Sequence, residues 1–487
     1  MRIRTARFKS FFVAASLLLS TTLAFSPVPA HAATDFLDTT SFGTFYRPFA
    51  ADSPWNKRPI NPVLRAGEIK KPLYNPTWIP VVDDGTLSLR VFIAKAGDPS
   101  VTIHGKPGTS GVGDPDTGLY RTITIPRWPA TVVPASGGDG HADVVDTVTG
   151  IVHSFYQLKY VGGKWTAGMY SWTRLDGRGF GEGGHWSQGA RASGVPNMGG
   201  LIRIHEIDDG EPYYRHALAM TLPRHTLSGG TAVPSYIRPA TSTDGNASQN
   251  TGTVPMGALI MLPPGFDVNK LSSPKLRKIA ATLKLWGAYV VDSNYDTAYG
   301  IHVENGANFS LMRPGTWDTK VVADLELIRA ALRQVAGASR WVDGNVVTRN
   351  VEAPMELLSM RGTWLFPHTS VKGPGSFDTW SQALVFPNMA SKVTLINYNN
   401  EVSKVAWAKP VPGGRMRFES QSTGGATIRL QVNVAGKVIF DSGFLENGAA
   451  ANFIWPTAAA GQVTVTLQAE SGVKQASSTR GVLTNVF

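Results

Sequence analysis

The stretch IVHSFYQLKYVGGKWTAGMY, residues 151–170, decides the fold class of this chain. Apolar and aromatic side chains recur at roughly every second position on both sides of the Gly162-Gly163 pair, which is the pattern of two antiparallel strands joined by a tight turn. Such a hairpin packs one face and leaves the other in water, so it needs a second layer. We therefore expect an antiparallel sheet within a larger β-fold.

The same alternation of short apolar runs with Gly, Pro, Asn and Asp clusters extends from about residue 41 to residue 315. It predicts a further hairpin, in which Trp78–Val82 and Thr86–Ile93 flank a turn at residues 83–85. The chain between residues 341 and 373 loses this periodicity, which is typical of a linker or a domain edge. After it, six more strands are predicted in the order Val393–Tyr398, Arg415–Gln421, Ala426–Val434, Lys437–Phe440, Ala451–Trp455 and Gln462–Gln468.

Two helices interrupt the β-pattern. The first is predicted to begin at Pro274, capped by Ser273, and to end at Gly287, with a strand over Ala288–Asp292 directly after it. The second is predicted over Ala323–Val335 from the helical spacing of its apolar residues. The fold class is therefore mainly β. We expect a β-sandwich or jelly roll with two capping helices over residues 33–345, a linker over 346–372, and an accessory β-sandwich, which can bind glycan or serve as a spacer, over 373–487.

Composition excludes several classes of protein. With 51 Gly, 32 Pro and 42% apolar residues the chain is neither disordered nor a bundle of membrane spans. The absence of Cys removes disulfides, thiolate nucleophiles and Cys-ligated zinc. The basic residues are scattered rather than clustered, so we expect no nucleic-acid partner. We also expect no cofactor and no metal ion, and the oligomeric state stays open.

The first residues have the pattern of a secretory signal peptide. Basic residues between Arg2 and Lys9 precede an apolar run over 11–25, and Ala30-His31-Ala32 provides a cleavage site. We expect cleavage near Ala32, and hence an extracellular or periplasmic protein. The formal charge of +11 includes four basic residues of this segment, so the mature chain keeps +7. That charge would attract an anionic polymer, although it also suits simple solubility.

The densest polar cluster lies between residues 141 and 225. In a strand His141 and Asp143 would point to one face of the sheet, where they would be an acid–base pair or simply part of a solvated strand face. Asp292 closes an apolar strand, where its carboxyl group would reach the rim of the sheet and supply a catalytic carboxylate or cap a turn. Trp172 and Trp186 are candidates for stacking on sugar rings, although aromatic residues at strand spacing also serve as core packing.

The run His205–Glu211 contains Glu-x-Asp-x-x-Glu and resembles the active-site strand of the laminarinase and agarase group of jelly-roll glycosidases. The resemblance implies that Glu206 is the nucleophile, Asp208 tunes it and Glu211 is the acid–base residue. Glycoside hydrolysis of this kind needs two carboxyl groups on either side of the scissile bond. The sequence departs from the pattern at Asp209-Gly210, a turn signal that indicates a loop before a strand at Tyr213–Thr221.

The residues that follow suggest a second chemistry. A polysaccharide lyase needs a base, such as Tyr214 or His216, and a cationic group, such as Arg191 or Arg203, to stabilise the carboxylate of a uronic acid. The alternative for His216 is a buried, hydrogen-bonded strand histidine.

The order of motifs over residues 45–310 resembles a group of secreted microbial β-rich proteins that lies near polysaccharide-active enzymes. The motifs that carry this resemblance are Ser53-Pro54-Trp55-Asn56, Asp139-Gly140-His141, Arg191–Pro196, Gly200–Arg203, Glu206, His216-Ala217-Leu218 and Gly287–Asp292. The resemblance implies secretion and a glycan target, with no particular reaction attached.

We therefore expect a secreted enzyme that cleaves the glycosidic bonds of an extracellular polysaccharide. Glu206 with Asp143 or Asp292 would supply the carboxylates, and we favour hydrolysis. His141 and His216 would orient groups or transfer protons, and Arg191, Arg203 and Tyr214 would bind substrate. The alternatives are a lyase that acts on uronic acids and a non-catalytic glycan-binding protein.

Overall fold

The computed structural model describes residues 35–71, 80–83, 85, 87–116, 119–181, 187–230, 233–294, 297–307, 309, 311, 318–349, 358, 360, 363–378, 383–398, 410, 412–458 and 462–485. The expected signal peptide and Trp186 lie outside these residues. The fold is mainly β, as predicted, with several multi-stranded sheets and two α-helices in the described part of the chain. Neither helix is long and apolar enough to cross a membrane.

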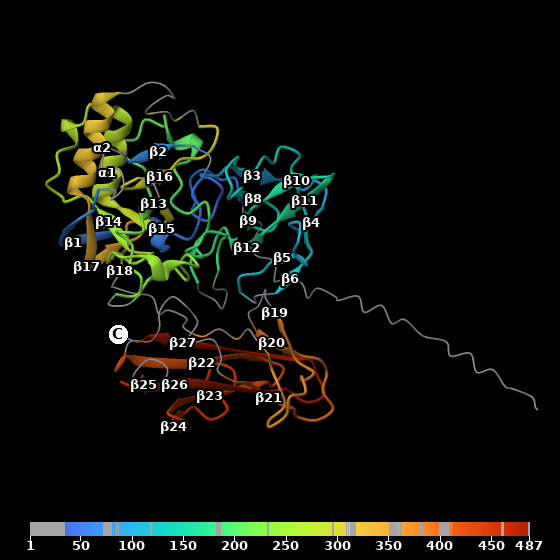
Figure 1. The fold of residues 1–487 in the computed structure, drawn as a ribbon. Helices are drawn as coiled ribbons and strands as arrows, with labels where there is room; N and C mark the ends of the chain where they lie inside the picture. The colour runs from blue at the N-terminus through green and yellow to red at the C-terminus, as the bar shows by residue number, and fades with distance from the viewer. Residues whose placement is uncertain are drawn as a thin grey trace, which may run out of the picture. The chain divides into compact units, whose positions relative to one another are not determined.

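The largest sheet has eight strands and is mixed (Figure 1). Its order is β1-β17-β14-β15-β13-β16-β2, with β18 beside β17, and two of its pairs, β13 with β15 and β16 with β2, are parallel. The strands are β1 (Arg58–Glu68), β2 (Val81–Asp83), β13 (Leu218–Pro223), β14 (Leu259–Met261), β15 (Ala288–Asn294), β16 (Gly300–His302), β17 (Arg333–Val342) and β18 (Thr348–Arg349). All residues of β13 are buried, so this strand runs through the core.

Helices α1 (Pro274–Leu285) and α2 (Thr319–Ala331) lie side by side and share one apolar core with β13 and β15 (Figure 1). As predicted, the Ser273 hydroxyl caps α1 by accepting a hydrogen bond from the Leu276 amide, and Gly287 follows with φ +74°. Helix α2 begins and ends four residues before its predicted bounds, because the Asp318 carboxylate caps it and the chain from Arg333 pairs with β1.

Replacing Asp318 with alanine should lower the free energy of unfolding by about 1 kcal/mol, because its carboxylate accepts hydrogen bonds from the Lys320 and Val321 amides at the start of α2. Urea unfolding of the variant would measure this loss. Asp318→Asn, which keeps an acceptor at the cap, is the control and should lose much less.

Two further sheets are built from residues 91–174. One has the order β3-β8-β9-β12-β5-β6 and the other β10-β11-β4-β7. The strands are β3 (Val91–Ala94), β4 (Val101–Gly105), β5 (Val112–Gly113), β6 (Tyr120–Arg121), β7 (Ile123–Ile125), β8 (Ala142–Asp146), β9 (Ile151–Tyr156), β10 (Lys159–Val161), β11 (Lys164–Ala167) and β12 (Met169–Arg174). Their apolar faces form a common core around Val144, Phe155 and Tyr170.

The two predicted hairpins have different outcomes. The one around Gly162-Gly163 is confirmed, because β10 pairs with β11 and β9 with β12, both antiparallel. The one around residues 83–85 is wrong, because β2 and β3 belong to different sheets. Strand β2 pairs with β16 and β3 with β8, which is buried along its whole length and so needs a partner on both sides.

Residues 376–485 form a β-sandwich of their own, with sheets in the orders β19-β20-β27-β22-β25 and β21-β26-β23-β24. The strands are β19 (Ser376–Asp378), β20 (Ala383–Phe386), β21 (Thr394–Tyr398), β22 (Arg415–Thr423), β23 (Thr427–Val434), β24 (Lys437–Asp441), β25 (Ala450–Ile454), β26 (Val463–Glu470) and β27 (Ser477–Asn485). Phe386, Phe418, Leu430 and Leu467 fill its core. All six predicted strands are present. The exact domain boundaries stay predictions.

Candidate functional site

A pocket of about 830 Å³ lies among the described residues, and its size is typical of ligand sites. Its walls come from the loop before β8, from residues 187–194 and 242–245, and from the ends of β15 and β16. We call it the first pocket. Its ionisable lining consists of Asp139, His141, Tyr156, Arg191, Asp244, Asp292 and His302.

Asp292 is the most perturbed carboxyl group in this pocket. It lies on β15 just after four buried apolar residues, and its side chain is 22% exposed. Burial and the charge of Asp244 raise the pKa of Asp292 to about 7, against a partial offset from Arg191. Asp292 therefore holds a proton near neutral pH and still faces the pocket. Burial also raises the pKa of Asp139.

The three carboxyl groups of the pocket all affect the phenol group of Tyr156. Burial, followed by the charges of Asp139, Asp292 and Asp244, raises the pKa of Tyr156. The pocket thus brings together three acidic residues from three separate segments of the chain, which is the kind of arrangement that pairs a proton donor with an ionised carboxylate.

The two histidines of the pocket are neutral. Burial and the Arg191 charge lower the pKa of His141 to about 3 and that of His302 well below its usual range. The His141 Nδ1 atom lies 3.2 Å from the Phe155 carbonyl oxygen, which can only accept, so Nδ1 carries the proton. Nε2 of His141 is then an acceptor.

Arg191 is buried in the wall of the pocket, and its side chain is 0% exposed. Its Nε and Nη2 atoms each donate to the Asn197 carbonyl at 3.3 Å, and Nη1 lies 3.3 Å from His302 Nε2 and 3.9 Å from Asp292 Oδ2. Arg191 lines the pocket but its side chain has no exposed surface, and its role in substrate binding stays a prediction.

Asp143 lies outside the lining of the first pocket, and its catalytic role stays a prediction. It is fully buried within β8 and accepts a hydrogen bond from the Met198 amide at 2.9 Å. Burial raises the pKa of Asp143 to about 7. A solvated strand face is excluded as well, because every residue of β8 is buried.

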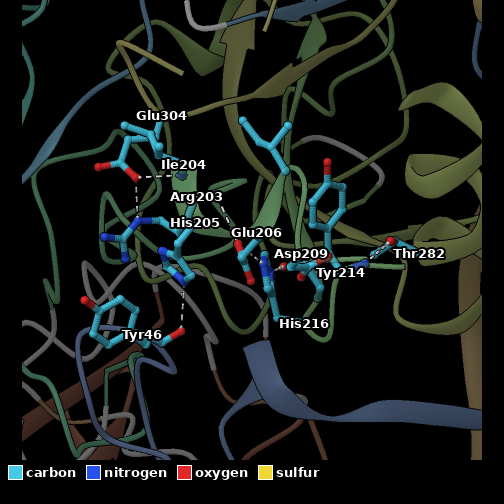
Figure 2. Close-up of polar contacts among 12 residues, drawn as sticks. Tyr46, Arg203, Ile204, His205, Glu206, Asp209, Tyr214, His216, Thr282 and Glu304 are labelled. Atoms are coloured by element: carbon cyan, nitrogen blue, oxygen red, sulfur yellow. Dashed lines mark hydrogen bonds and ion pairs between the residues drawn. The ribbon is translucent and has the colours of Figure 1, made fainter. Parts of the chain in front are cut away.

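Glu206 and His216 lie in a second, smaller pocket, away from Asp292. Figure 2 shows Glu206 pointing toward His216, whose Nε2 atom lies 3.2 Å from Glu206 Oε2. Both side chains are 15% exposed. The predicted pairing of Glu206 with Asp143 or Asp292 across one cleft is therefore wrong.

The resemblance of residues 205–211 to a glycosidase strand is not supported by the backbone. Ile204–Glu206 is a short 3₁₀ helix, and a turn with Gly210 at φ +80° follows it. The cause is local: the Glu206 carboxylate accepts from the Arg203 amide at 2.9 Å and closes the turn.

Arg203 and Tyr214 are both largely buried. The Arg203 side chain is 3% exposed and its Nε atom donates to Glu304 Oε2 at 2.9 Å (Figure 2). Tyr214 is buried in the apolar core beneath α1, where the Lys278 ammonium lies over its ring. Their roles in substrate binding stay predictions. Trp172 is half-buried on β12, and its stacking on sugar stays a prediction.

Sequence reasoning found His141 and Asp292 but missed Asp139, Asp244 and His302 as members of the first pocket. Asp139 and Asp244 lie in irregular loops, where no periodicity points a side chain toward a face. The one local pattern that the two loops share is an aspartate directly before a glycine, at Asp139-Gly140 and at Asp244-Gly245. Among the described residues, no group of three or more side chains is arranged to hold a metal ion.

The Glu206–His216 pair should make stability depend on pH. Nearby His216 and hydrogen bonds outweigh burial and hold the pKa of Glu206 at about 2, while Glu206 outweighs burial and raises the pKa of His216. The Glu206 contribution is present above about pH 4.5. The His216 contribution is present below about pH 6.5 and is lost as pH rises through the raised value.

Glu206→Gln should therefore destabilise the protein most near pH 5.5 and less at pH 9. Urea unfolding of both proteins at the two pH values would test this. Glu211→Gln, in an exposed pair with Arg215, is the control and should show little change at either pH. A constant Glu206→Gln effect across the range would contradict the charged pair.

No family model and no curated protein matches the chain. Among solved structures, the chain is similar to the glycosylation-associated Gap123 complex of Streptococcus agalactiae at 12% identity, over 26% of this chain and 44% of that chain, with a TM-score of 0.18. It is also weakly similar to a structure described as "CBM4 structure and function" at 15% identity, over 26% and 95%, with a TM-score of 0.16. A third is TmCBM61 in complex with β-1,4-galactotriose, at 14% identity over 21% and 70%, with a TM-score of 0.15. TM-scores this low do not show that this chain shares a fold or a function with any of the three.

Proposed function

We propose that the first pocket is the catalytic site of a secreted glycoside hydrolase. One observation carries the proposal: Asp292, a carboxyl group with a pKa of about 7, faces an open pocket beside the charge of Asp244. Glycoside hydrolysis needs a protonated acid and an ionised carboxylate on either side of the scissile bond. Burial of one carboxyl group beside another is the usual way in which a protein keeps one of them protonated near neutral pH.

In this proposal Asp292 donates its proton to the glycosidic oxygen as the bond to the leaving sugar breaks. Asp244 supplies the second carboxyl group, which activates water or attacks the anomeric carbon. The His141 Nε2 atom accepts a hydrogen bond from a sugar hydroxyl. Arg191 touches no substrate and acts as a positioning residue through Asp292 and His302.

The lining also suggests the class of sugar. Three carboxyl groups line the pocket, and the only Lys or Arg among its described lining residues is Arg191, whose side chain has no exposed surface. A uronic acid would place its carboxylate among these acidic residues, so we propose a neutral polysaccharide. The +7 charge of the mature chain is not concentrated at this pocket.

A lyase is the second candidate, and the neutral imidazole of His141 favours it, because a neutral imidazole can act as a base. It would need a cation to face the uronate carboxylate, and Arg191 is too buried to do so. Secretion, with cleavage near Ala32, and glycan binding by the sandwich of residues 376–485 belong to the same proposal.

The decisive experiment incubates the purified mature protein with neutral and uronic-acid polysaccharides and follows new reducing ends and the ultraviolet absorbance of unsaturated uronides. New reducing ends without absorbance are expected from neutral substrates. A rise in both signals would establish the lyase instead. Saturable binding without any cleavage would support the non-catalytic glycan-binding alternative.

A further inference from the structure

The second pocket has a volume of about 40 Å³, enough for an ion with few heavy atoms and far too small for a sugar chain. It lies between the segment of residues 42–49, the 198–206 segment and residues 215–216. The glycoside hydrolase proposed above makes no use of it.

A buried donor in the wall of this pocket has no partner. Arg203 uses Nε for Glu304 and Nη1 for the Phe45 carbonyl oxygen, 3.1 Å away, while its Nη2 atom is buried without a hydrogen-bond partner among the described residues. The guanidinium is planar, so two fixed nitrogens also fix the third. An unsatisfied buried charged donor is costly, and a bound acceptor would remove that cost.

Most ionisable side chains of the lining are basic, and three of them already have a carboxylate partner: Arg203 has Glu304, Arg215 has the exposed Glu211 and His216 has Glu206. Glu206 is the one carboxylate among the described residues that line the pocket, beside Arg47, Arg203, Arg215 and His216. Glu206 is already bonded to His216 and to a backbone amide.

The positive charges of Arg47 and Arg215 repel each other. Burial and the Arg215 charge lower the pKa of Arg47, and the attraction of Asp38 offsets them only in part. The Phe42 ring, with its centroid 3.9 Å from Arg47 Cζ, holds the Arg47 guanidinium in place. Arg215 also pairs with the exposed Glu211, so the donor that stays unsatisfied among the described residues is Arg203 Nη2, and a bound anion would satisfy it.

We propose that the second pocket binds one small anion, a carboxylate or an inorganic oxyanion, through the Arg203 Nη2 atom and the guanidinium groups of Arg47 and Arg215. Two sources share this chemistry: a free inorganic anion, and the acidic group of a sugar derivative. The proposal stands on different residues from the glycoside hydrolase proposal, so either one can fail without the other.

Isothermal titration of the full mature protein with sulfate, acetate and glucuronate, in a buffer without chloride, tests the proposal. We expect saturable binding of at least one probe with one site per chain. Arg47→Gln and Arg215→Gln should each weaken it at least about tenfold. Arg340→Gln, which removes an exposed arginine on β17, is the matched control and should leave the affinity unchanged.

The unfolding midpoint of each variant, measured without probe, shows whether the fold is kept. Sulfate binding as tight as glucuronate binding would identify a free inorganic anion as the ligand, and glucuronate binding well above acetate would identify an acidic sugar. Absence of saturable binding for all three probes, or equal weakening by Arg340→Gln and Arg47→Gln, would overturn the proposal.

Discussion

Replacing Asp292 with asparagine should lower kcat/KM on the cleaved polysaccharide at least about 100-fold, because asparagine cannot donate the proton that the leaving sugar needs. Asp176→Asn is the matched control: Asp176 forms an exposed pair with Arg174, and its loss should leave the rate unchanged. Initial rates from reducing ends would measure both variants. An Asp292→Asn protein with nearly full activity would remove Asp292 from the proposed mechanism.

The pH profile provides the sharper test of the same residue. Because burial and Asp244 raise the pKa of Asp292 to about 7, the parent enzyme should lose activity as pH rises through that value. The residual activity of Asp292→Asn should not show this alkaline limb, the fall in activity as pH rises through about 7. A limb that persists in the variant would assign the titration to another group.

Asp292→Asn should reduce activity without reducing stability at alkaline pH. A carboxyl group whose pKa rises on folding stabilises the folded protein only at low pH, and its contribution is lost between its ordinary value of 3.8 and about 7. At pH 8 the ionised Asp292 therefore costs stability, and Asp292→Asn should be at least as stable as the parent. Such a gain would mark a position where function, rather than folding, selects the residue.

Much of the fold follows from local patterns in the sequence. The two-residue turn at Gly162-Gly163, the Ser273 cap and the alternation in residues 415–434 each act within a few residues, so the strands and helices they predict are present. The failed hairpin around residues 83–85 shows the limit of such patterns. Which strand pairs with β2 depends on β16, more than 200 residues later in the chain, and no local pattern encodes that choice.

Some residues of the candidate site could also be predicted from the sequence, and others could not. Asp292 could be found because it ends an apolar strand, whereas Asp244 reaches it from a loop. Arg191 and Arg203 look like substrate-binding residues in the sequence, but both are buried, and charged side chains are rarely buried without partners. Burial of these residues depends on contacts with His302 and Glu304, which only the three-dimensional structure reveals.

Glu304→Ala should lower the free energy of unfolding by about 3–5 kcal/mol, because it leaves the buried Arg203 charge without its partner. The Glu304 and Arg203 side chains are only 4% and 3% exposed. The Glu304 carboxylate also accepts from the Ile204 and Val91 amides, both at 3.1 Å, so it joins the start of β3 to the 3₁₀ helix that carries Glu206. Two residues before it, His302 lines the first pocket.

Glu419→Ala is the control for this prediction. Glu419 also pairs with an arginine, Arg417, but the two side chains are 34% and 43% exposed, so the loss should stay below about 1 kcal/mol. Urea unfolding monitored by tryptophan fluorescence would compare the two variants. Equal losses would mean that burial does not decide the strength of the Arg203–Glu304 pair. A large loss for Glu304→Ala alone would show that the buried Glu304 carboxylate, with its ion pair and its two amide hydrogen bonds, anchors the wall of the second pocket.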